Sequence, residues 1–155
     1  MKAVLQRVSE ASVETDGAVI GRCGTGLMIL LGVADGDTEA DSIALAEKIS
    51  KLRIFCDPDG KMNLSVTDVG GSALVISNFT LCADYRKGNR PDYFGAAKPD
   101  EAERLYLHFT DELNKRIGGV EKGKFGADMK VSLVNDGPVT IIMDSDVLLK
   151  KTVTL

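Results

Sequence analysis

The sequence is poor in the residue types on which metal sites and nucleophilic triads depend. It has 155 residues, with a single histidine, His108, three widely spaced cysteines and no tryptophan. Because a zinc site needs clustered cysteine and histidine ligands, Cys23, Cys56 and Cys82 are interpreted as reduced thiols without a metal or a disulfide framework. His108 falls outside the apolar stripe of its predicted helix, so we expect no chemistry through a histidine base.

Long apolar stretches are also missing. The longest runs, Leu27–Leu31 and Ala73–Ile76, fall far short of the roughly 20 residues that a membrane-spanning helix needs. The N-terminal segment MKAVLQRVSEASVE alternates polar and apolar residues and lacks the continuous apolar stretch of a signal peptide. We therefore expect a cytoplasmic protein with no membrane partner.

Neither sign of charge dominates. The chain carries 19 basic and 23 acidic side chains, for a net charge of −4. This balance argues against a protein that coats nucleic acid non-specifically, and we expect no DNA partner. Contact with RNA would depend on a local basic patch instead.

The remaining composition is that of a globular protein, with 44% hydrophobic and 27% charged residues. The length predicts one domain over residues 1–155. Strands outnumber helices in the apolar pattern, which predicts an α+β fold: a mixed or antiparallel sheet that curls toward a barrel, with two main helices. The predicted strands are Lys2–Val8, Ser12–Thr15, Ala18–Cys23, Leu27–Val33, Ala73–Phe79, Lys130–Val134, Val139–Met143 and a short one near Thr152–Leu155.

Turn and cap signals separate these elements. Asp16-Gly17 is typical of a two-residue hairpin, and the Asp57–Gly60 segment of a turn with proline in its second position. One helix is predicted from Asp37 or Thr38 to about Arg53. The second is predicted from Pro99 to Gly118-Gly119, with an apolar stripe formed by Ala102, Leu105, Phe109, Leu113 and Ile117.

Three segments carry candidate functional residues. Ser77-Asn-Phe-Thr-Leu81 ends a buried strand, Asn135-Asp-Gly-Pro-Val-Thr140 lies between two strands, and Arg86-Lys-Gly-Asn-Arg-Pro91 gathers three cations in a loop. Each also has a plain structural interpretation. Phe79 can be a core residue, Gly137-Pro138 a tight turn with or without a cis bond, and the cationic loop merely solvated.

The first two of these segments, SNFTL and NDGPVT, resemble the two signature motifs of the D-aminoacyl-tRNA deacylases (the D-tyrosyl-tRNA deacylase family), usually written SQFTL and NxGPVT. The resemblance extends over nearly the whole chain and departs from the family pattern at Asn78, where glutamine is usual, and at Asp92, where serine is usual. It also includes, in order, AVLQRV, GTGLMILLGV, KISKLRIFCDPDGKMN, KGNRPDYF and KGKFGADMKVSLVNDGPVTI.

The resemblance implies an α/β-barrel-like homodimer that hydrolyses the ester of D-aminoacyl-tRNA without a cofactor. In the family the Gly-Pro pair has a cis bond and reaches into the active site of the other subunit. Carried over, Gly137-Pro138 would complete a partner's pocket and exclude L-amino acids, which implies broad tolerance of D side chains and hydrolysis of glycyl-tRNA. The implied catalytic segment consists of Ser77, Asn78, Phe79 and Thr80.

Other residues are candidates for supporting roles. Arg7, in the AVLQRV segment, can hold the Gly-Pro loop, although an ordinary strand-end arginine fits the residues equally well. The candidate contacts to tRNA phosphates are Arg86, Lys87, Arg90, Lys122 and Lys124.

The residues leave the mechanism open. Thr80 is the natural nucleophile, but the sequence offers no base to activate it. We expect Thr80 and nearby backbone N–H groups to position the ester and stabilise its oxyanion, while the vicinal 2′-hydroxyl of the adenosine assists attack by water. Two alternatives remain: a non-catalytic tRNA-binding proofreading adaptor, and a small dimeric hydrolase that acts on another D-aminoacyl ester.

Overall fold

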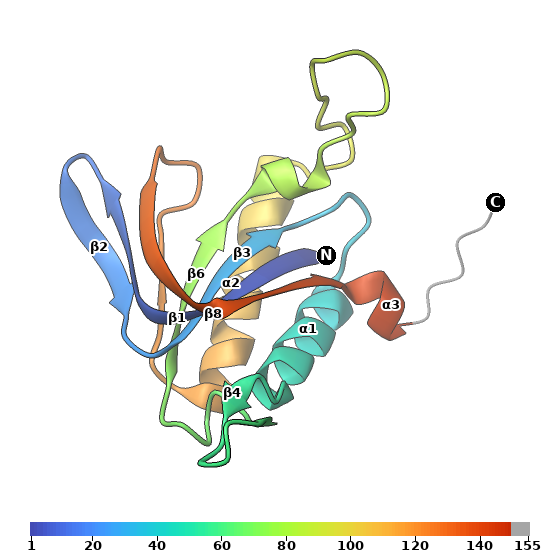
Figure 1. Ribbon diagram of the computed structural model, residues 1–155. Helices are drawn as coiled ribbons and strands as arrows, with labels where there is room; N and C mark the ends of the chain where they lie inside the picture. Colours follow the sequence, from blue (N-terminus) through green and yellow to red (C-terminus); the bar gives the residue numbers. More distant parts are fainter. Residues whose placement is uncertain (150–155) are drawn as a thin grey trace.

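The sheet is organised around its long first strand. In the computed structural model, which describes residues 1–149, β1 (Lys2–Thr15) pairs along one edge with β3 (Gly26–Gly32) and then β2 (Ala18–Cys23), all antiparallel. Along its other edge β1 pairs with β8 (Lys130–Asp144). Beyond β3, the strands β6 (Ser72–Ser77) and β7 (Val120–Lys122) continue the sheet in parallel. The result is the predicted mixed sheet (Figure 1).

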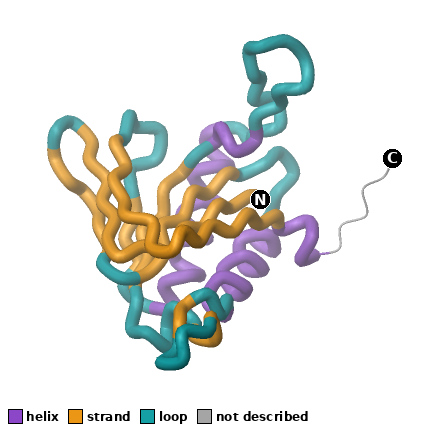
Figure 2. The backbone as a smooth tube through the Cα atoms, in the orientation of Figure 1, coloured by secondary structure: helices purple, strands orange, loops and turns teal. Residues whose placement is uncertain are grey.

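Two helices are the connections between the parallel strands. Helix α1 (Glu39–Lys51) follows β3, and α2 (Pro99–Ile117) follows β6. Both helices lie on the same side of the sheet (Figure 2). β3 and β6 are apolar along nearly their whole length, as expected for parallel strands that are covered on both faces.

The helix ends follow the predicted signals. The Asp41 carboxylate accepts hydrogen bonds from the backbone N–H (2.8 Å) and the hydroxyl of Thr38, which caps α1. Pro99 begins α2, and Gly118 ends it with a φ of 67°. The predicted stripe of α2 is buried as far as Leu113, and Tyr106 beside it is buried as well.

Two pairs of predicted strands are in fact continuous. Lys2–Val8 and Ser12–Thr15 form the single strand β1, and Lys130–Val134 joins Val139–Met143 in β8. The two halves of β8 stay paired to β1 on either side of a bulge, so the segment between them does not become a separate hairpin. The bulge gives β8 a sharp bend near its middle (Figure 1).

Other boundaries differ by a few residues. β6 ends at Ser77 rather than Phe79, because the chain turns there into a short 3-10 helix, η1 (Phe79–Cys82). The sequence pattern did not predict the short strands β4 (Phe55–Cys56), β5 (Met62–Leu64) and β7, nor α3 (Ser145–Leu149). The strand predicted near Thr152–Leu155 lies outside the described residues.

The core has two parts because the sheet curls on itself. One cluster packs between the sheet and the two helices, and a smaller one, with Val13, Met28 and Leu74, lies inside the curl. β2 approaches β7 so closely that a Cβ atom at Gly21 would lie 2.8 Å from the Lys122 carbonyl oxygen. The sheet is therefore nearly closed into a barrel. Within residues 1–149 we find no helix with the length and apolar character of a bilayer-crossing segment.

Candidate functional site

The predicted Ser77–Thr80 segment lies where β6 leaves the core. The backbone N–H of Asn78 donates to the Leu31 carbonyl (2.8 Å), which directs the chain into η1 across the end of β3. Gly32 makes this crossing possible: a Cβ atom there would lie 2.9 Å from the Leu81 Cβ and 3.0 Å from the Asn78 carbonyl oxygen. A side chain at position 32 would push η1 off the sheet.

A mainly apolar cleft of about 720 Å³ opens beside this segment. Its walls come from β3, from η1, from the chain before α2, from α2 itself and from the loop before β8. The loop between η1 and α2 and the loop between β7 and β8 both lie at the η1 end of the molecule (Figure 1). Only Lys98 and Asp128 are charged among the lining residues. Aromatic side chains dominate the walls: Phe79, Tyr93, Phe94, Tyr106 and Phe125.

Phe79 is a wall residue and not a core residue, so the core interpretation is wrong. Its side chain is 58% exposed and meets the Tyr93 ring edge to face, with ring centroids 5.1 Å apart. Phe94 beside it is 91% exposed. Tyr93 and Phe94 both belong to the KGNRPDYF segment, but neither was predicted as a site residue from the sequence.

Asn78 and Thr80 are bound to each other. The Asn78 side-chain oxygen accepts from the Thr80 backbone N–H (3.2 Å) and from the Thr80 hydroxyl. An amide oxygen is not a general base, so this arrangement holds the threonine without activating it. In the described part of the chain, the Phe79 N–H has no hydrogen-bond acceptor, because it begins η1. That N–H is a free donor at the cleft.

No histidine lines the cleft. His108 lies between α1 and α2, where its Nδ1 contacts the Ser42 hydroxyl. Tyr106 lines the cleft floor, but its hydroxyl donates to the Val75 carbonyl (2.8 Å), and burial raises the pKa of Tyr106. The tyrosine therefore stays neutral and directed away from the cleft.

The Gly137-Pro138 pair occupies the bulge of β8. Gln6 pairs with Thr140 and Val8 with Asn135, which leaves residues 136–139 opposite Arg7 alone. The Gly137-Pro138 peptide bond is cis. We call residues 136–139 the Gly-Pro loop.

Two side chains hold the Gly-Pro loop from behind. Arg7 donates through Nε to the Asp136 carbonyl (2.9 Å) and through Nη1 to the Ile54 carbonyl (2.8 Å). Asn135 donates through Nδ2 to the carbonyls of Arg7 (3.0 Å) and Val139 (2.9 Å), which closes the base of the loop. Asn135 begins the NDGPVT motif, but no role was predicted for its side chain from the sequence.

The structure does not bring the two motifs together within one chain. Residues 136–138 are exposed, and none of residues 136–139 lines the cleft. Across residues 1–149, no hydrogen bond joins the Gly-Pro loop to the Ser77–Thr80 segment. The loop presents its outer side to solvent.

Four of the five predicted phosphate contacts lie on the two loops that contribute residues to the cleft, and Lys122 ends β7 just before the second of these loops. Arg86 is already paired with Asp84 through Nε (2.9 Å) and Nη2 (2.5 Å), and its guanidinium holds the pKa of Asp84 at about 2. Lys87 and Arg90 form no ion pair in the described part of the chain. On the other loop, Lys124 comes just before the wall residue Phe125, whereas Lys122 ends β7 and lines a separate hollow with Ile20. Neither lysine has a carboxylate partner among residues 1–149.

Asp92, the second departure from the family motif, helps to shape the first of these loops. Its backbone exchanges two hydrogen bonds with Asp84, of 2.9 and 3.0 Å, and its carboxylate accepts from the Phe94 N–H (3.2 Å). These contacts close the base of the loop and direct Phe94 toward the cleft.

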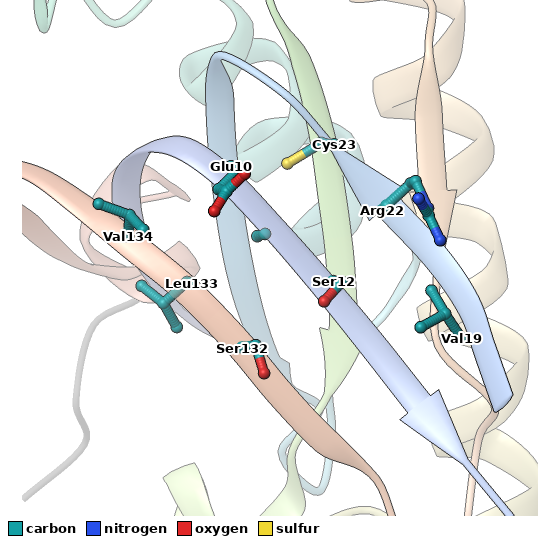
Figure 3. A pocket seen from close by; sticks show the side chains of 9 residues that line it. Glu10, Ser12, Val19, Arg22, Cys23, Ser132, Leu133 and Val134 are labelled. Carbon is teal, nitrogen blue, oxygen red and sulfur yellow. The ribbon is translucent and has the colours of Figure 1, made fainter. Parts of the chain in front are cut away.

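Two further features lie apart from the candidate residues. A hollow of about 340 Å³ over β1, β2 and β8 is lined by Glu10, Arg22 and Ser132 among others (Figure 3). Asp37, Asp41 and Asp146 bring carboxylate oxygens within 4.8 Å of one another, as a metal site would. The Met1 ammonium forms an ion pair with Asp37 at 2.7 Å, so a positively charged group of the chain itself already neutralises part of this cluster.

Comparisons with known proteins agree with the motifs. A family model described as "D-Tyr-tRNA(Tyr) deacylase" matches residues 4–144. The chain is 57% identical over 144 residues to a "D-aminoacyl-tRNA deacylase" of Ruegeria pomeroyi, which covers 93% of this chain and 99% of that protein. It is 57% identical over 145 residues to a protein of the same name from Bacillus cytotoxicus, which covers 94% of this chain and 99% of that one.

Solved structures share the fold. One, named "c-Myc DNA Unwinding Element Binding Protein", superposes with a TM-score of 0.87 at 42% identity and covers 93% of this chain and 98% of its own. Another, named "Structural Analysis of a probable eukaryotic D-amino acid tRNA deacylase", gives a TM-score of 0.78 at 16% identity, with 92% of this chain and 97% of its own covered. At that identity the second likeness concerns the fold alone.

Proposed function

The chain belongs to the D-Tyr-tRNA(Tyr) deacylase family, and on that premise we propose that it hydrolyses the ester between a D-amino acid and the terminal adenosine of tRNA. It is an ester hydrolase, a D-aminoacyl-tRNA deacylase. We assign this reaction to the aromatic cleft beside the Ser77–Thr80 segment, because the free Phe79 N–H lies at the wall of that cleft. Because tRNA is the substrate, we expect the protein to act in the cytoplasm.

The cleft suits the end of an aminoacyl-tRNA. Its volume of about 720 Å³ is within the usual range for a small-molecule site. Adenine stacks well on aromatic side chains, and each such stacking contact contributes about 1–3 kcal/mol. Lys87, Arg90 and Lys124, on the loops that contribute residues to the cleft, and Lys122 at the end of β7 are the candidate contacts to phosphates of the acceptor strand.

The chemistry relies on position and electrostatics. Water adds to the ester carbonyl, the Phe79 N–H donates to the developing oxyanion, and the ribose oxygen leaves as a hydroxyl after it receives a proton. The vicinal ribose hydroxyl assists the attacking water, because the cleft holds no histidine and the Thr80 hydroxyl is bound to Asn78. Asn78, Thr80 and Ser77 keep the strand end in place for this reaction.

Stereochemical selection belongs to the Gly-Pro loop of a second subunit. The loop is exposed, is held from behind by Arg7, and does not line its own cleft, as expected of a segment that enters another molecule. There, the backbone of Gly137-Pro138 would occupy the space that an L side chain needs. Because this backbone selects by excluding L side chains, D side chains of many sizes are accepted. Glycine has no side chain to exclude, so glycyl-tRNA is also a substrate.

The outer edge of β8 supports a homodimer. Within the described residues β8 pairs only with β1, so its other edge carries unpaired backbone groups beside exposed apolar side chains such as Val134 and Ile142. A long, exposed edge strand of this kind readily pairs with another chain. The Gly-Pro loop lies in the middle of the same strand, so dimerisation along β8 would carry it toward the partner.

Deacylation rates on matched tRNAs test the function and its alternatives. The purified protein should release amino acid from D-Tyr-, D-Ala- and Gly-tRNA at comparable rates and leave L-Tyr- and L-Ala-tRNA intact. Binding of D-Tyr-tRNA without turnover would identify a proofreading adaptor, whereas turnover of a free D-Tyr ester alone would identify a hydrolase of another substrate. If Gly-tRNA is as resistant as L-Ala-tRNA, the site recognises the D side chain, and the proposed selection by exclusion of L side chains is wrong.

Mixing a variant that loses activity with one that loses selectivity tests the shared site. Phe79→Ala impairs the cleft and Gly137→Ala displaces the loop, so a heterodimer of the two contains one intact pair of elements. Random exchange of subunits should restore selective deacylation in about one quarter of the sites. No recovery, or a fully active monomer in sedimentation at micromolar concentration, would show that each chain works alone.

A further inference from the structure

The β4–β5 hairpin carries the LRIFCDPDGKMN stretch, which the proposed function does not use. We propose that this hairpin is a positioning element for the Gly-Pro loop. Arg53, Asp57 and Asn63 fix the Ile54 carbonyl, to which Arg7 is anchored while it holds Asp136. The inference rests on the proposed role of the Gly-Pro loop in rejecting L-amino acids.

The hairpin is too short to hold its shape by strand pairing alone. β4 and β5 have only two and three residues, paired between Phe55 and Leu64 and between Cys56 and Met62. The Asp57 carboxylate closes the turn, because Oδ1 accepts from the N–H groups of Asp59 and Lys61 at 2.9 Å each. The same carboxylate therefore fixes the chain where it leaves β4.

Asn63 links this turn to the base of the hairpin. Its Nδ2 donates to Asp57 Oδ2 (2.9 Å), and this contact is the main reason why the pKa of Asp57 lies below its usual value. Its side-chain oxygen accepts from Arg53 Nη2 (2.8 Å), and its carbonyl accepts from Arg53 Nε (2.9 Å). Arg53 is thus held by a two-point contact, whose geometry lysine cannot reproduce.

The residue after Arg53 supplies the acceptor for Arg7. Ile54 and Phe55 are buried in the main core, so the hairpin base is fixed by packing on one side and by Arg53 on the other. The Ile54 carbonyl can then meet Arg7 Nη1 at 2.8 Å. Because a guanidinium is planar and rigid, fixing Nη1 also fixes the direction of Nε and hence the position of the Asp136 carbonyl.

A comparable surface network lacks this connection. Arg104 on α2 forms two contacts with Glu101, of 3.0 and 2.7 Å, and a third with Glu39 at 2.9 Å. It matches Arg53 in residue type and exposure and forms one hydrogen bond more, yet no hydrogen bond leads from it to Arg7 or the Gly-Pro loop within residues 1–149. Arg104→Ala is therefore the control variant.

The test measures the ratio of D-Ala-tRNA to L-Ala-tRNA deacylation rates in the full-length protein. Arg53→Ala and Asn63→Ala should each lower this ratio by roughly 3- to 30-fold, mainly through faster loss of L-Ala, as expected for coupling between residues that do not touch the substrate. The D-Ala rate should change less than about threefold, because the cleft is untouched. Arg104→Ala should leave the ratio as in the unaltered protein, although it disturbs the surface equally.

A double variant separates the proposed route from general loosening. If the hairpin acts through Arg7, the Arg53→Ala/Arg7→Ala protein should show the same ratio as Arg7→Ala alone. Additive effects would mean that the hairpin acts otherwise, and the inference would be wrong. Should Arg53→Ala not fold, as judged by circular dichroism, Asn63→Ala and Asp57→Asn carry the same test.

The controls also separate this inference from the function on which it rests. If the unaltered protein does not distinguish D-Ala- from L-Ala-tRNA, the proposed role of the Gly-Pro loop fails. If the unaltered protein distinguishes them, Arg7→Ala reduces the distinction and all hairpin variants retain it, only the positioning role of the hairpin is refuted.

Discussion

The Ser77–Thr80 segment and the Gly-Pro loop differ in how much of their surroundings their own chain provides. The first lies in a cleft walled by aromatic side chains from several elements of the same chain. Residues 136–138 of the second are exposed, and this loop is held on its inner side by Arg7 and Asn135 and by packing of Val139 against the core. One chain thus builds a reaction site and a separate selecting surface, and we expect rate and selectivity to respond to different substitutions.

The two regions also differ in the reach of the contacts that hold them. Asn78 and Thr80 bond each other across two residues, whereas Arg7 reaches Asp136 across 129 positions of the sequence. Local contacts of the first kind keep their geometry when distant elements move. The Gly-Pro loop, by contrast, depends on the register of β1 with β8 and on the β4–β5 hairpin.

The largest expected effect concerns the reaction site. Replacing the terminal adenosine by its 2′-deoxy form should slow deacylation at least about a hundredfold, as loss of an acid–base group does. Thr80→Ala should cost less than about tenfold, far below the roughly 10⁶-fold loss of a true nucleophile. Single-turnover rates on both substrates check this. An aminoacyl ester trapped on Thr80 would reverse the assignment.

The next effect concerns the selecting surface. Gly137 has a φ of 143°, and a Cβ atom there would lie 2.8 Å from the Val139 N and 3.2 Å from Arg7 Nη2, so Gly137→Ala must displace the loop. We expect the D-Ala to L-Ala rate ratio to fall by about tenfold or more, the scale of losing a close steric contact. Gly24→Ala, which meets no atom within 4 Å, is the matched control. Equal D-Ala to L-Ala rate ratios for both variants would show that this loop does not determine selectivity.

A smaller effect separates the cations on the loop between η1 and α2. Lys87→Ala and Arg90→Ala should each reduce the slope of log affinity against log salt by about one, because each removes one phosphate contact. Arg86→Ala should change the slope less, since Asp84 already neutralises Arg86. Filter binding to tRNA between low and moderate salt measures all three. A larger change for Arg86 would show that Asp84 releases it on binding.

The smallest effect is chemical and probes the back of the Gly-Pro loop. Cys56 is exposed beside Arg7 and should react first with iodoacetamide. Burial raises the pKa of Cys23 to about 11, so at pH 8 only about one molecule in a thousand carries its thiolate, and Cys23 should react last. Mass spectrometry over time gives the order. Labelling at Cys56 should lower the D-to-L ratio slightly, and Cys56→Ser should remove that sensitivity.

The sequence predicted those parts of the fold that local patterns encode. The hairpin at Asp16-Gly17, the proline start of α2 and the apolar stripe of α2 all follow from neighbours within a few residues, and the structure confirms them. The continuity of β8 was not predictable in this way. Polar residues and a proline interrupt its pattern, and only pairing with β1 on both sides of the bulge makes it one strand.

The candidate site was likewise predictable from the sequence only in part. The motifs predicted Ser77–Thr80 and Gly137-Pro138 as site candidates, but periodicity did not reveal that Phe79 leaves the core, because an aromatic residue after a buried strand usually stays inside. The walls formed by Tyr93 and Phe94 depend on how a loop closes through Asp84 and Asp92. Such long loops have no periodic signal to interpret.

The bulge in β8 has a consequence for changes in chain length. The ladders on its two sides are each fixed by their own pairs with β1, and the residues between them belong to neither ladder. Insertion or deletion of a residue in 136–139 therefore leaves both registers intact, whereas the same change elsewhere in β8 would turn the following side chains to the opposite face. β8 therefore contributes to both the barrel wall and the Gly-Pro loop, and the number of residues in the loop can change without altering the strand pairing that forms the wall.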